Sequence, residues 1–189
     1  MFFNNINNIR KHFMTICRHK RWVFHYCRIA GILIRGIKHD LSKFSPTEFF
    51  ESAKYFQGNR SPIDACKEEN GYSEAWLHHK GRNRHHYEYW VDNLDNGGQP
   101  LRMPFKDALE MVCDYLGAGR AYMKKNFSYK AEYEWWKNKI SKPIAMHPQT
   151  KEFVNSILYK LSCGNSEKEV FKDAEIIYYI SYFKNKINN

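Results

Sequence analysis

The chain has 189 residues, of which 43% are hydrophobic, 16% aromatic and 26% charged. This length and composition are typical of a water-soluble globular protein with one buried core. The longest apolar run, IAGILIRGI, is too short to span a bilayer, and the N-terminal segment lacks the order and cleavage site of a secretory signal. These features argue against a membrane-spanning or secreted protein, and we expect a cytoplasmic location and no membrane partner.

The cysteines and the charges narrow the class further. Five cysteines without a C-x-x-C pair indicate reduced, buried thiols, and neither a disulfide framework nor a thiolate zinc site. The formal net charge of +10 is uneven, because residues 1–38 hold eight Lys/Arg and no acid, whereas residues 39–119 hold nine bases and thirteen acids. Residues 120–189 are basic again. Basic ends can attract nucleic acid, but a solvated lysine-rich surface is the simpler interpretation, because no nucleic-acid-binding motif accompanies them.

The first predicted element is an amphipathic helix over residues 4–29, where apolar residues recur every three or four positions. A second helix begins after Ser45, with Pro46 at its first position and Glu48 as the glutamate of a capping box, and runs to about residue 56. Similar start signals stand at Ser61 and Ser73, and a glycine separates the two segments.

The second half of the chain is predicted to be helical as well. Residues 92–100 form the clearest loop, and a helix that is apolar on most sides follows over residues 105–125. Two more helices are expected near residues 149–162 and 166–186, and no alternating run of strand length appears. The predicted fold class is therefore all-α, a compact helical bundle.

The nine histidines gather in a few places on these elements. They are His12, His19 and His25 on the first helix, His39 beside Asp40, the group His78, His79, His85 and His86 in one short segment, and His147. At 100° per residue, His12 and His19 lie on the flank of the apolar stripe, whereas His25 lies on the opposite face. A metal ligand must point into the bundle, so His19 or His12 is favoured over His25.

A carboxylate on the central helix needs a partner. Asp114 has Met111, Ala118 and Ala121 on its own face, and an unpaired carboxylate among apolar groups is costly. Histidines and carboxylates together suit divalent iron, manganese, zinc, nickel or cobalt. Each of these residues alone also has an ordinary explanation as a hydrogen-bonded or surface side chain, so the argument depends on their order.

In chain order the sequence gives His19, then His39-Asp40 with Lys43, then His79, His85-His86 and Asp114. This series resembles the H…HD…H…HH…D order of the HD-domain superfamily of metal-dependent phosphohydrolases, most closely its HD-GYP branch, over roughly residues 15–125. The stretch HDLSK is similar to HD-x-G-K with Ser42 in place of glycine, and HHYEYW stands where that branch has a glycine-tyrosine-proline element. The dinucleotide substrate of the branch is therefore not carried over.

A second resemblance is closer. The phrases HKRWV, HDLSKFSPTEF, NRHHYEYW and EMVCDY are similar to those of a family of small bacterial and phage proteins of unknown function. This resemblance favours His19, within HKRWV, as the first ligand, and it implies no activity of its own.

The superfamily resemblance implies a bundle of the HD-domain type at residues 1–126 and a C-terminal helical extension at residues 127–189, packed on the same core. It implies that His19, His39, Asp40 and Asp114 hold one metal ion and that His79, His85 and His86 hold a second, with Asp40 or a water between them. Asp40 and Lys43 would be the catalytic residues, and Lys43 would contact phosphate. Candidate substrate contacts are Lys80, Arg82, Asn83 and Arg84. Exposure to solvent is the competing interpretation for the three basic residues, and Asn83 is alternatively interpreted as a residue that orients a histidine.

The expected function is hydrolysis of a nucleotide or related small phosphate ester with one or two divalent transition-metal ions. A different class is a non-catalytic accessory protein that binds nucleic acid or protein and has a structural or vestigial metal site. A third interpretation, di-iron oxygen chemistry on an HD scaffold, uses the same ligands. The oligomeric state and the role of residues 127–189 stay open.

Overall fold

The computed structural model describes residues 2–187, and the side chains of residues 6–183. The α-helices are α1 (Phe2–Ile29), α2 (Leu33–Lys38), α3 (Pro46–Lys54), α4 (Pro62–Asn70), α5 (Glu74–Lys80), α6 (Phe105–Met123), α7 (Tyr129–Ile140), α8 (Pro148–Ser162), α9 (Glu167–Lys172) and α10 (Ala174–Ile187). Short 3₁₀ helices are η1 (Leu41–Phe44), η2 (Tyr87–Trp90), η3 (Leu94–Asn96) and η4 (Lys124–Asn126), and the strands are β1 (Val91–Asp92) and β2 (Gln99–Pro100). The all-α prediction is confirmed.

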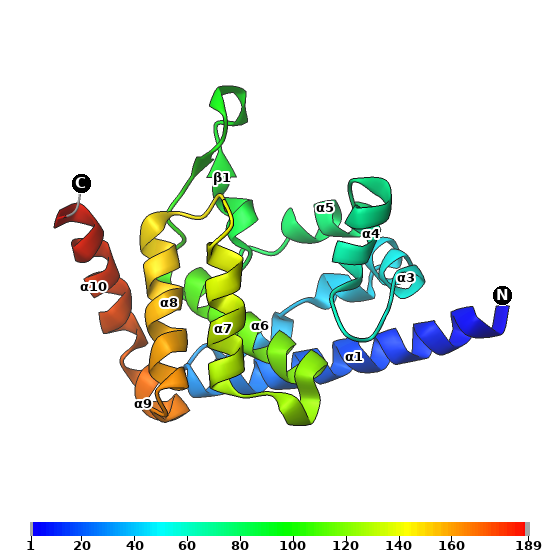
Figure 1. Cartoon of the computed structure of the whole chain (residues 1–189), viewed down its shortest axis with the longest axis horizontal. Helices are drawn as coiled ribbons and strands as arrows, with labels where there is room; N and C mark the ends of the chain where they lie inside the picture. Colours follow the sequence, from blue (N-terminus) through cyan, green and yellow to red (C-terminus); the bar gives the residue numbers. More distant parts are fainter. Residues whose placement is uncertain (1, 188–189) are drawn as a thin grey trace.

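One small sheet departs from that prediction. β1 and β2 pair antiparallel, with Val91 opposite Pro100 and Asp92 opposite Gln99, and form a hairpin that projects from the helical body (Figure 1). Asn93 and Gly97 turn the chain with positive φ. The expectation of no strand was wrong here, because two-residue strands are too short to leave an alternating pattern in the sequence.

Serine caps set three of the predicted helix starts, whereas Ser61 precedes α4 without a capping hydrogen bond from its side chain. The hydroxyl groups of Ser45, Ser73 and Ser166 accept hydrogen bonds from backbone N–H groups of the first turns of α3, α5 and α9. The capping box of Ser166 and Glu169 is present, and its helix ends at Lys172, so that α9 and α10 are separate helices where one was predicted. α7 was not predicted, although Ser128 caps it by accepting from the N–H of Ala131.

The core lies mainly between α1, α6 and the C-terminal helices. α6 packs along α1, and twelve of its nineteen residues are buried, which confirms its central position. α8 packs against α6, α7 and α10, and the fully buried Trp136 and Phe153 belong to the same hydrophobic cluster as Val23 of α1. Figure 1 shows α3, α4 and α5 grouped over the N-terminal half of α1, with α7 to α10 over the other side.

The cysteines and the helix lengths bear on two further expectations. All five cysteines are free, as predicted, and Cys27, Cys66 and Cys113 are buried. Burial was wrongly expected for Cys17 and Cys163, which are exposed. None of the described helices combines the length and apolar character that crossing a membrane requires.

The close contact of α1 and α6 depends on Gly117. A Cβ at this position would lie 2.5 Å from Cγ2 of Val23 and 3.1 Å from its backbone nitrogen. We expect Gly117→Ala to reduce the free energy of unfolding by about 1 to 3 kcal/mol, because the helix backbones must separate to accept the methyl group. Urea denaturation measures the change, and Asn138→Ala on the exposed face of α7 is the control that should change stability little. An unchanged or higher stability of Gly117→Ala would contradict this packing.

Candidate metal centre

Five segments deliver the seven predicted ligands to one place. His19 lies on α1, His39 and Asp40 lie between α2 and η1, His79 lies on α5, His85 and His86 lie between α5 and η2, and Asp114 lies on α6. Asp40 has a left-handed backbone conformation, with φ 53° and ψ 31°, which aspartate tolerates better than most residues. This turn allows the neighbouring side chains of His39 and Asp40 both to face the interior, where they are 2% and 0% exposed.

The first group of ligand atoms consists of His19 Nε2, His39 Nε2, Asp40 Oδ2 and Asp114 Oδ1. Their separations are 3.1 Å for His19–Asp114, 3.2 Å for His39–Asp40, 3.3 Å for His19–Asp40, and 3.4 Å for both His39–Asp114 and His19–His39. Ligands placed about 2.1 Å from one ion, at angles of about 90° to 110°, are about 3.0 to 3.4 Å apart. The four atoms therefore have the spacing of a single coordination shell.

The second group shares Asp40 with the first. Its other oxygen, Oδ1, is 3.3 Å from Nε2 of His79 and 3.3 Å from Nε2 of His85, and the Nε2 atoms of His79 and His86 are 2.9 Å apart. The carboxylate of Asp40 thus lies between the two groups, with one oxygen facing each. The helix through Gly81 that would have placed His79 and His86 on one face is absent, because α5 ends at Lys80 and a turn brings His86 back.

Buried polar atoms without a hydrogen bond indicate whether a cation fits between the ligand groups. Among the residues that the structure describes, Asp40 Oδ1 and His85 Nε2 are buried and form no hydrogen bond, although they lie 3.3 Å apart. Leaving such atoms without a partner costs free energy, and coordination of a cation would remove that cost. Buried imidazole and carboxylate ligands of this kind can hold a metal ion, and a nitrogen and oxygen shell suits a divalent transition metal.

Two glutamates hold the histidine rings from behind. Glu48 Oε2 lies 2.7 Å from Nδ1 of His79, and Glu110 Oε1 lies 3.0 Å from Nδ1 of His39 and 3.4 Å from Nδ1 of His85. Arg35 donates to Glu110 at 2.9 Å. Metal-bound histidines commonly donate their second N–H to a carboxylate, which fixes the ring and directs the other nitrogen at the metal. The rings are therefore oriented with Nε2 toward the centre.

Neither glutamate was predicted to belong to the site. Glu48 was interpreted as a capping-box residue, which is wrong for its side chain: its N–H does donate to Ser45, but its carboxylate binds His78 and His79. Glu110 precedes Asp114 by four residues and so shares its helix face, a signal that was available in the sequence.

The carboxylates and histidines strongly affect one another's protonation. Burial opposes ionisation of Asp114, but hydrogen bonds from His19 and His39 lower its pKa well below the usual range. Burial likewise would lower the pKa of His39, but the charge of Asp40 and hydrogen bonds to Asp114 and Glu110 raise it. Protons thus balance the carboxylates when no cation does, and metal binding would release them.

The other predicted residues divide between the centre and the surface. Lys43 Nζ lies 2.5 Å from Asp40 Oδ2, and the Asp40 carboxylate raises the pKa of Lys43 despite burial. Asn83 donates to Ser42 Oγ at 3.0 Å and to the carbonyl of His79 at 2.8 Å, so it holds the turn between the histidines. Lys80, Arg82 and Arg84 do not line the cavity described below; Arg82 and Arg84 are exposed, and Arg84 binds Asp107 at 3.4 Å.

The alternative first ligands occupy different positions. His25 is half-buried and pairs with Glu167 at 3.2 Å, away from the metal groups. His12 is buried against the rings of Phe49 and Phe56, and burial lowers its pKa to about 4. Of the three histidines on α1, His19 is the one that joins the ligand groups.

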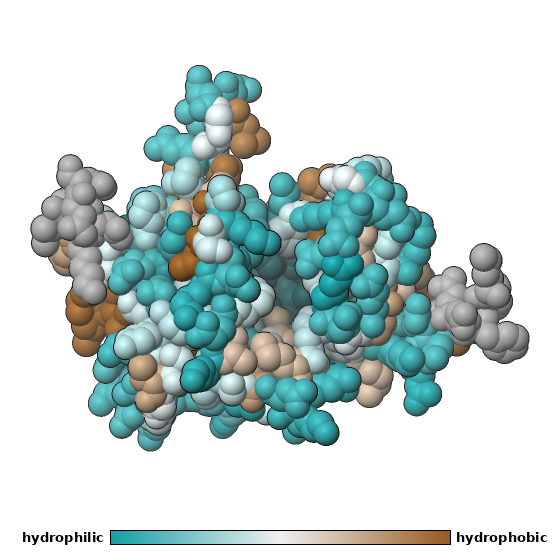
Figure 2. All heavy atoms as spheres, viewed as in Figure 1, coloured by the Kyte–Doolittle hydropathy of each residue, from teal (hydrophilic) through white to brown (hydrophobic). Residues whose placement is uncertain are grey.

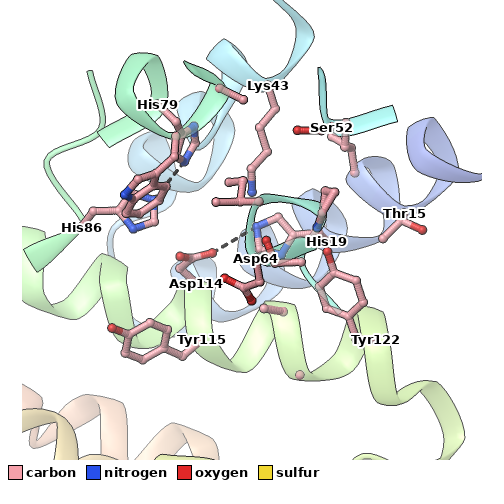
Figure 3. A pocket seen from close by; sticks show the side chains of 18 of the residues that line it. Thr15, His19, Lys43, Ser52, Asp64, His79, His86, Asp114, Tyr115 and Tyr122 are labelled. Carbon is pink, nitrogen blue, oxygen red and sulfur yellow. Dashed lines mark hydrogen bonds and ion pairs between the residues drawn. The ribbon is translucent and has the colours of Figure 1, made fainter. Parts of the chain in front are cut away.

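A cavity of about 400 Å³ opens onto the centre. Figure 2 shows the surface hollowed between the part that carries α4 and the part that carries α7. His19, Lys43, His79, His86 and Asp114 line the inner end of the cavity, where Figure 3 shows Lys43 extending toward His19 and Asp114. The remaining wall includes the aromatic side chains of Trp76, Tyr87, Tyr115, Tyr122 and Trp135, together with aliphatic, polar and acidic side chains.

Comparison with known proteins identifies the family. A family model with the description "Family of unknown function (DUF5662)" matches residues 8–160, and the chain belongs to this family. No curated protein and no solved structure matches the chain.

The glutamates behind the histidines give a direct test of the centre. We expect Glu48→Gln and Glu110→Gln each to weaken binding of Mn²⁺ or Zn²⁺ by about 10- to 100-fold, because the histidine rings lose the carboxylates that orient them. Competition with a chelating dye measures the affinities. Glu51→Gln is the matched control on α3, because Glu51 accepts hydrogen bonds from Ser73 and the start of α5 but not from a ligand. Equal affinities in all four proteins would contradict the arrangement.

Glu132 on α7 predicts a separate effect of pH on stability. Burial, aided by the charge of Asp114, raises its pKa to about 8, from about 4.5 in the unfolded chain. The folded state therefore binds a proton that the unfolded state has lost, and stability falls as pH rises from about 4.5 to about 8. At about 1.4 kcal/mol per pKa unit, the upper limit is roughly 5 kcal/mol.

Glu132→Gln should remove this dependence. We expect the free energy of unfolding of the variant, relative to wild type, to increase between about pH 5 and about pH 9 in urea denaturation with EDTA present. Glu134→Gln, at an exposed position of the same helix, should show no such trend. A difference between Glu132→Gln and wild type that is independent of pH would show that the carboxyl group is not held neutral.

Proposed function

We propose that the protein is a metal-dependent phosphohydrolase of the HD type that acts on a nucleotide or a related small phosphate ester. One observation carries the proposal: two ligand groups share the buried Asp40, and four of their seven residues also line a cavity of about 400 Å³. Structural metal sites have closed shells, whereas catalytic sites keep positions open to substrate. The cavity volume lies in the range of small-ligand sites.

The side chains divide the chemistry between them. His19, His39, Asp40 and Asp114 would hold one divalent ion, and His79, His85, His86 and the other oxygen of Asp40 would hold a second. Such ions, when bound, polarise a phosphoryl oxygen and lower the pKa of a coordinated water toward neutrality.

The remaining groups position the substrate and the ligands. The Lys43 ammonium group, held by Asp40 at the inner end of the cavity, supplies a positive charge for a phosphate oxygen. Glu48 and Glu110 keep the histidine rings in place, and the aromatic walls exclude water and offer flat surfaces to the organic part of the ester.

The alternatives differ in observable ways. A binding protein with a structural or vestigial site would have a closed ligand shell, and the open cavity argues against it. Nucleic acid stays a candidate partner of the basic segments only in that alternative. Oxygen chemistry at two irons uses the same ligands as hydrolysis and is separated from it by the reaction products.

Metal content and phosphate release test the proposal together. We expect wild-type protein reconstituted with Mn²⁺, Fe²⁺, Co²⁺ or Ni²⁺ to bind one or two ions and to release phosphate from at least one nucleotide. Asp40→Ala should lose metal and reduce kcat/KM by about a hundredfold or more, since the metal supplies several kcal/mol of stabilisation to the transition state.

The control is Asp95→Ala, on the exposed hairpin, which should retain metal and activity. Circular dichroism establishes that Asp40→Ala is folded. Protein that takes up none of the four metals, or that binds metal and releases no phosphate from nucleotides, would overturn the proposal. Oxygen uptake by the iron-loaded protein in that second case would favour the oxygenase alternative.

A further inference from the structure

Among the carboxylates that line the cavity and that the metal centre does not use, Glu132 is the most buried. Glu132, on α7, lines the cavity but is only 2% exposed, and its Oε2 atom forms no hydrogen bond within the described part of the chain. No ion pair joins Glu132 to any described lysine, arginine or histidine, although an unpaired buried carboxylate is costly.

The backbone of α6 is shaped to admit this carboxyl group. Gly119 faces Glu132, and a Cβ at that position would clash with Oε2 and crowd the Cδ atom of Glu132 at 3.0 Å. Gly119 follows Asp114 by five residues, which is about 7.5 Å along a helix. Glu132 is therefore too far along α6 to share an ion with Asp114, but it borders the same cavity.

Aromatic side chains line the same cavity as Glu132. The rings of Tyr115 and Trp135 lie 5.2 Å apart between centroids, and Lys139 Nζ lies 5.9 Å and 5.7 Å from the centroids of these two rings. All three residues line the cavity. Aromatic faces bind planar heterocycles by stacking, and a protonated carboxyl group presents one donor and one acceptor side by side.

We propose that Glu132 selects the organic part of the substrate, by pairing its carboxyl group with an adjacent donor and acceptor on a heterocyclic base that stacks on the aromatic wall. This inference rests on the proposed function, since it assumes that the phosphate end of the same molecule lies at the metal centre. Burial, aided by the charge of Asp114, raises the pKa of Glu132 to about 8, so the carboxyl group is protonated near neutral pH. Glu132 thus determines specificity for the organic part of the substrate, whereas the metal ligands act on its phosphate.

Two substitutions of Glu132 distinguish the effect of lost hydrogen bonds from the effect of a changed side-chain shape. Glu132→Gln retains one donor and one acceptor in the same outline, whereas Glu132→Met fills similar space without them. We expect calorimetric titration with adenosine, guanosine, cytidine and uridine to show binding of at least one nucleoside to wild type. Affinity for that nucleoside should change little in Glu132→Gln and fall at least about tenfold in Glu132→Met, because the polar groups of the base lose their partners.

Hydrolysis gives the second measurement. Ribose 5-phosphate lacks the base, so its kcat/KM should be the same in wild type and Glu132→Met, whereas KM for the preferred nucleoside monophosphate should rise in Glu132→Met alone. Glu134→Met, at an exposed position of α7, is the matched control and should resemble wild type in both assays.

The outcomes of the two proposals are distinct. Failure to bind any of the four nucleosides, or equal nucleoside affinity in wild type and Glu132→Met, would overturn the role of Glu132 whether or not phosphate is released. Nucleoside binding that depends on Glu132, in a metal-loaded protein without phosphatase activity, would support the role of Glu132 and overturn hydrolysis. Thermal denaturation of the variants shows that they are folded.

Discussion

The Asp40 carboxylate is buried, and the surrounding segments must supply partners for its charge, because an ionised carboxylate is costly to remove from water. Its Oδ2 atom faces His19, His39 and Lys43, and its Oδ1 atom faces His79 and His85. These partners come from α1, the turn before η1, η1 itself, α5 and the segment after α5. Segments that are far apart in the sequence are thus joined through one polar centre.

The hydrophobic core and this centre support different parts of the molecule. α1, α6 and the C-terminal helices share one apolar cluster, whereas α3, α4 and α5 contribute no residue to it in the part of the chain described. Those three helices are held by polar contacts, including the bond of Glu48 to His79 and that of Glu51 to Ser73, and by a smaller set of buried apolar side chains, among them Ala53, Ala65 and Ala75. The cavity lies where the two parts meet, so the proposed substrate site borders both the hydrophobic core and the smaller helical group.

Local signals predicted the elements well, and tertiary pairing explains what they missed. Serine caps and helical periodicity act within a few residues, so the starts of α3, α5 and α9 were predictable. The roles of Glu48 and Glu110 depend on histidines that lie about 30 and 71 residues away along the chain. The order of His19, His39, Asp40, His79, His85, His86 and Asp114 predicted which residues meet, but the turn after Lys80 that unites His79 with His86 was not visible in a helical pattern.

The charges around the cavity limit what its proposed substrate can carry. Apart from histidines, the basic side chains among its described lining residues are Lys43, which is paired with Asp40, and Lys139, which lies among aromatic rings. Arg82 and Arg84, exposed elsewhere, are not placed to neutralise a long phosphate chain within it. Metal ions would then supply most of the positive charge, and they are confined to the inner end. This distribution favours an ester with one phosphate group at the metal centre and an uncharged, planar remainder along the aromatic wall.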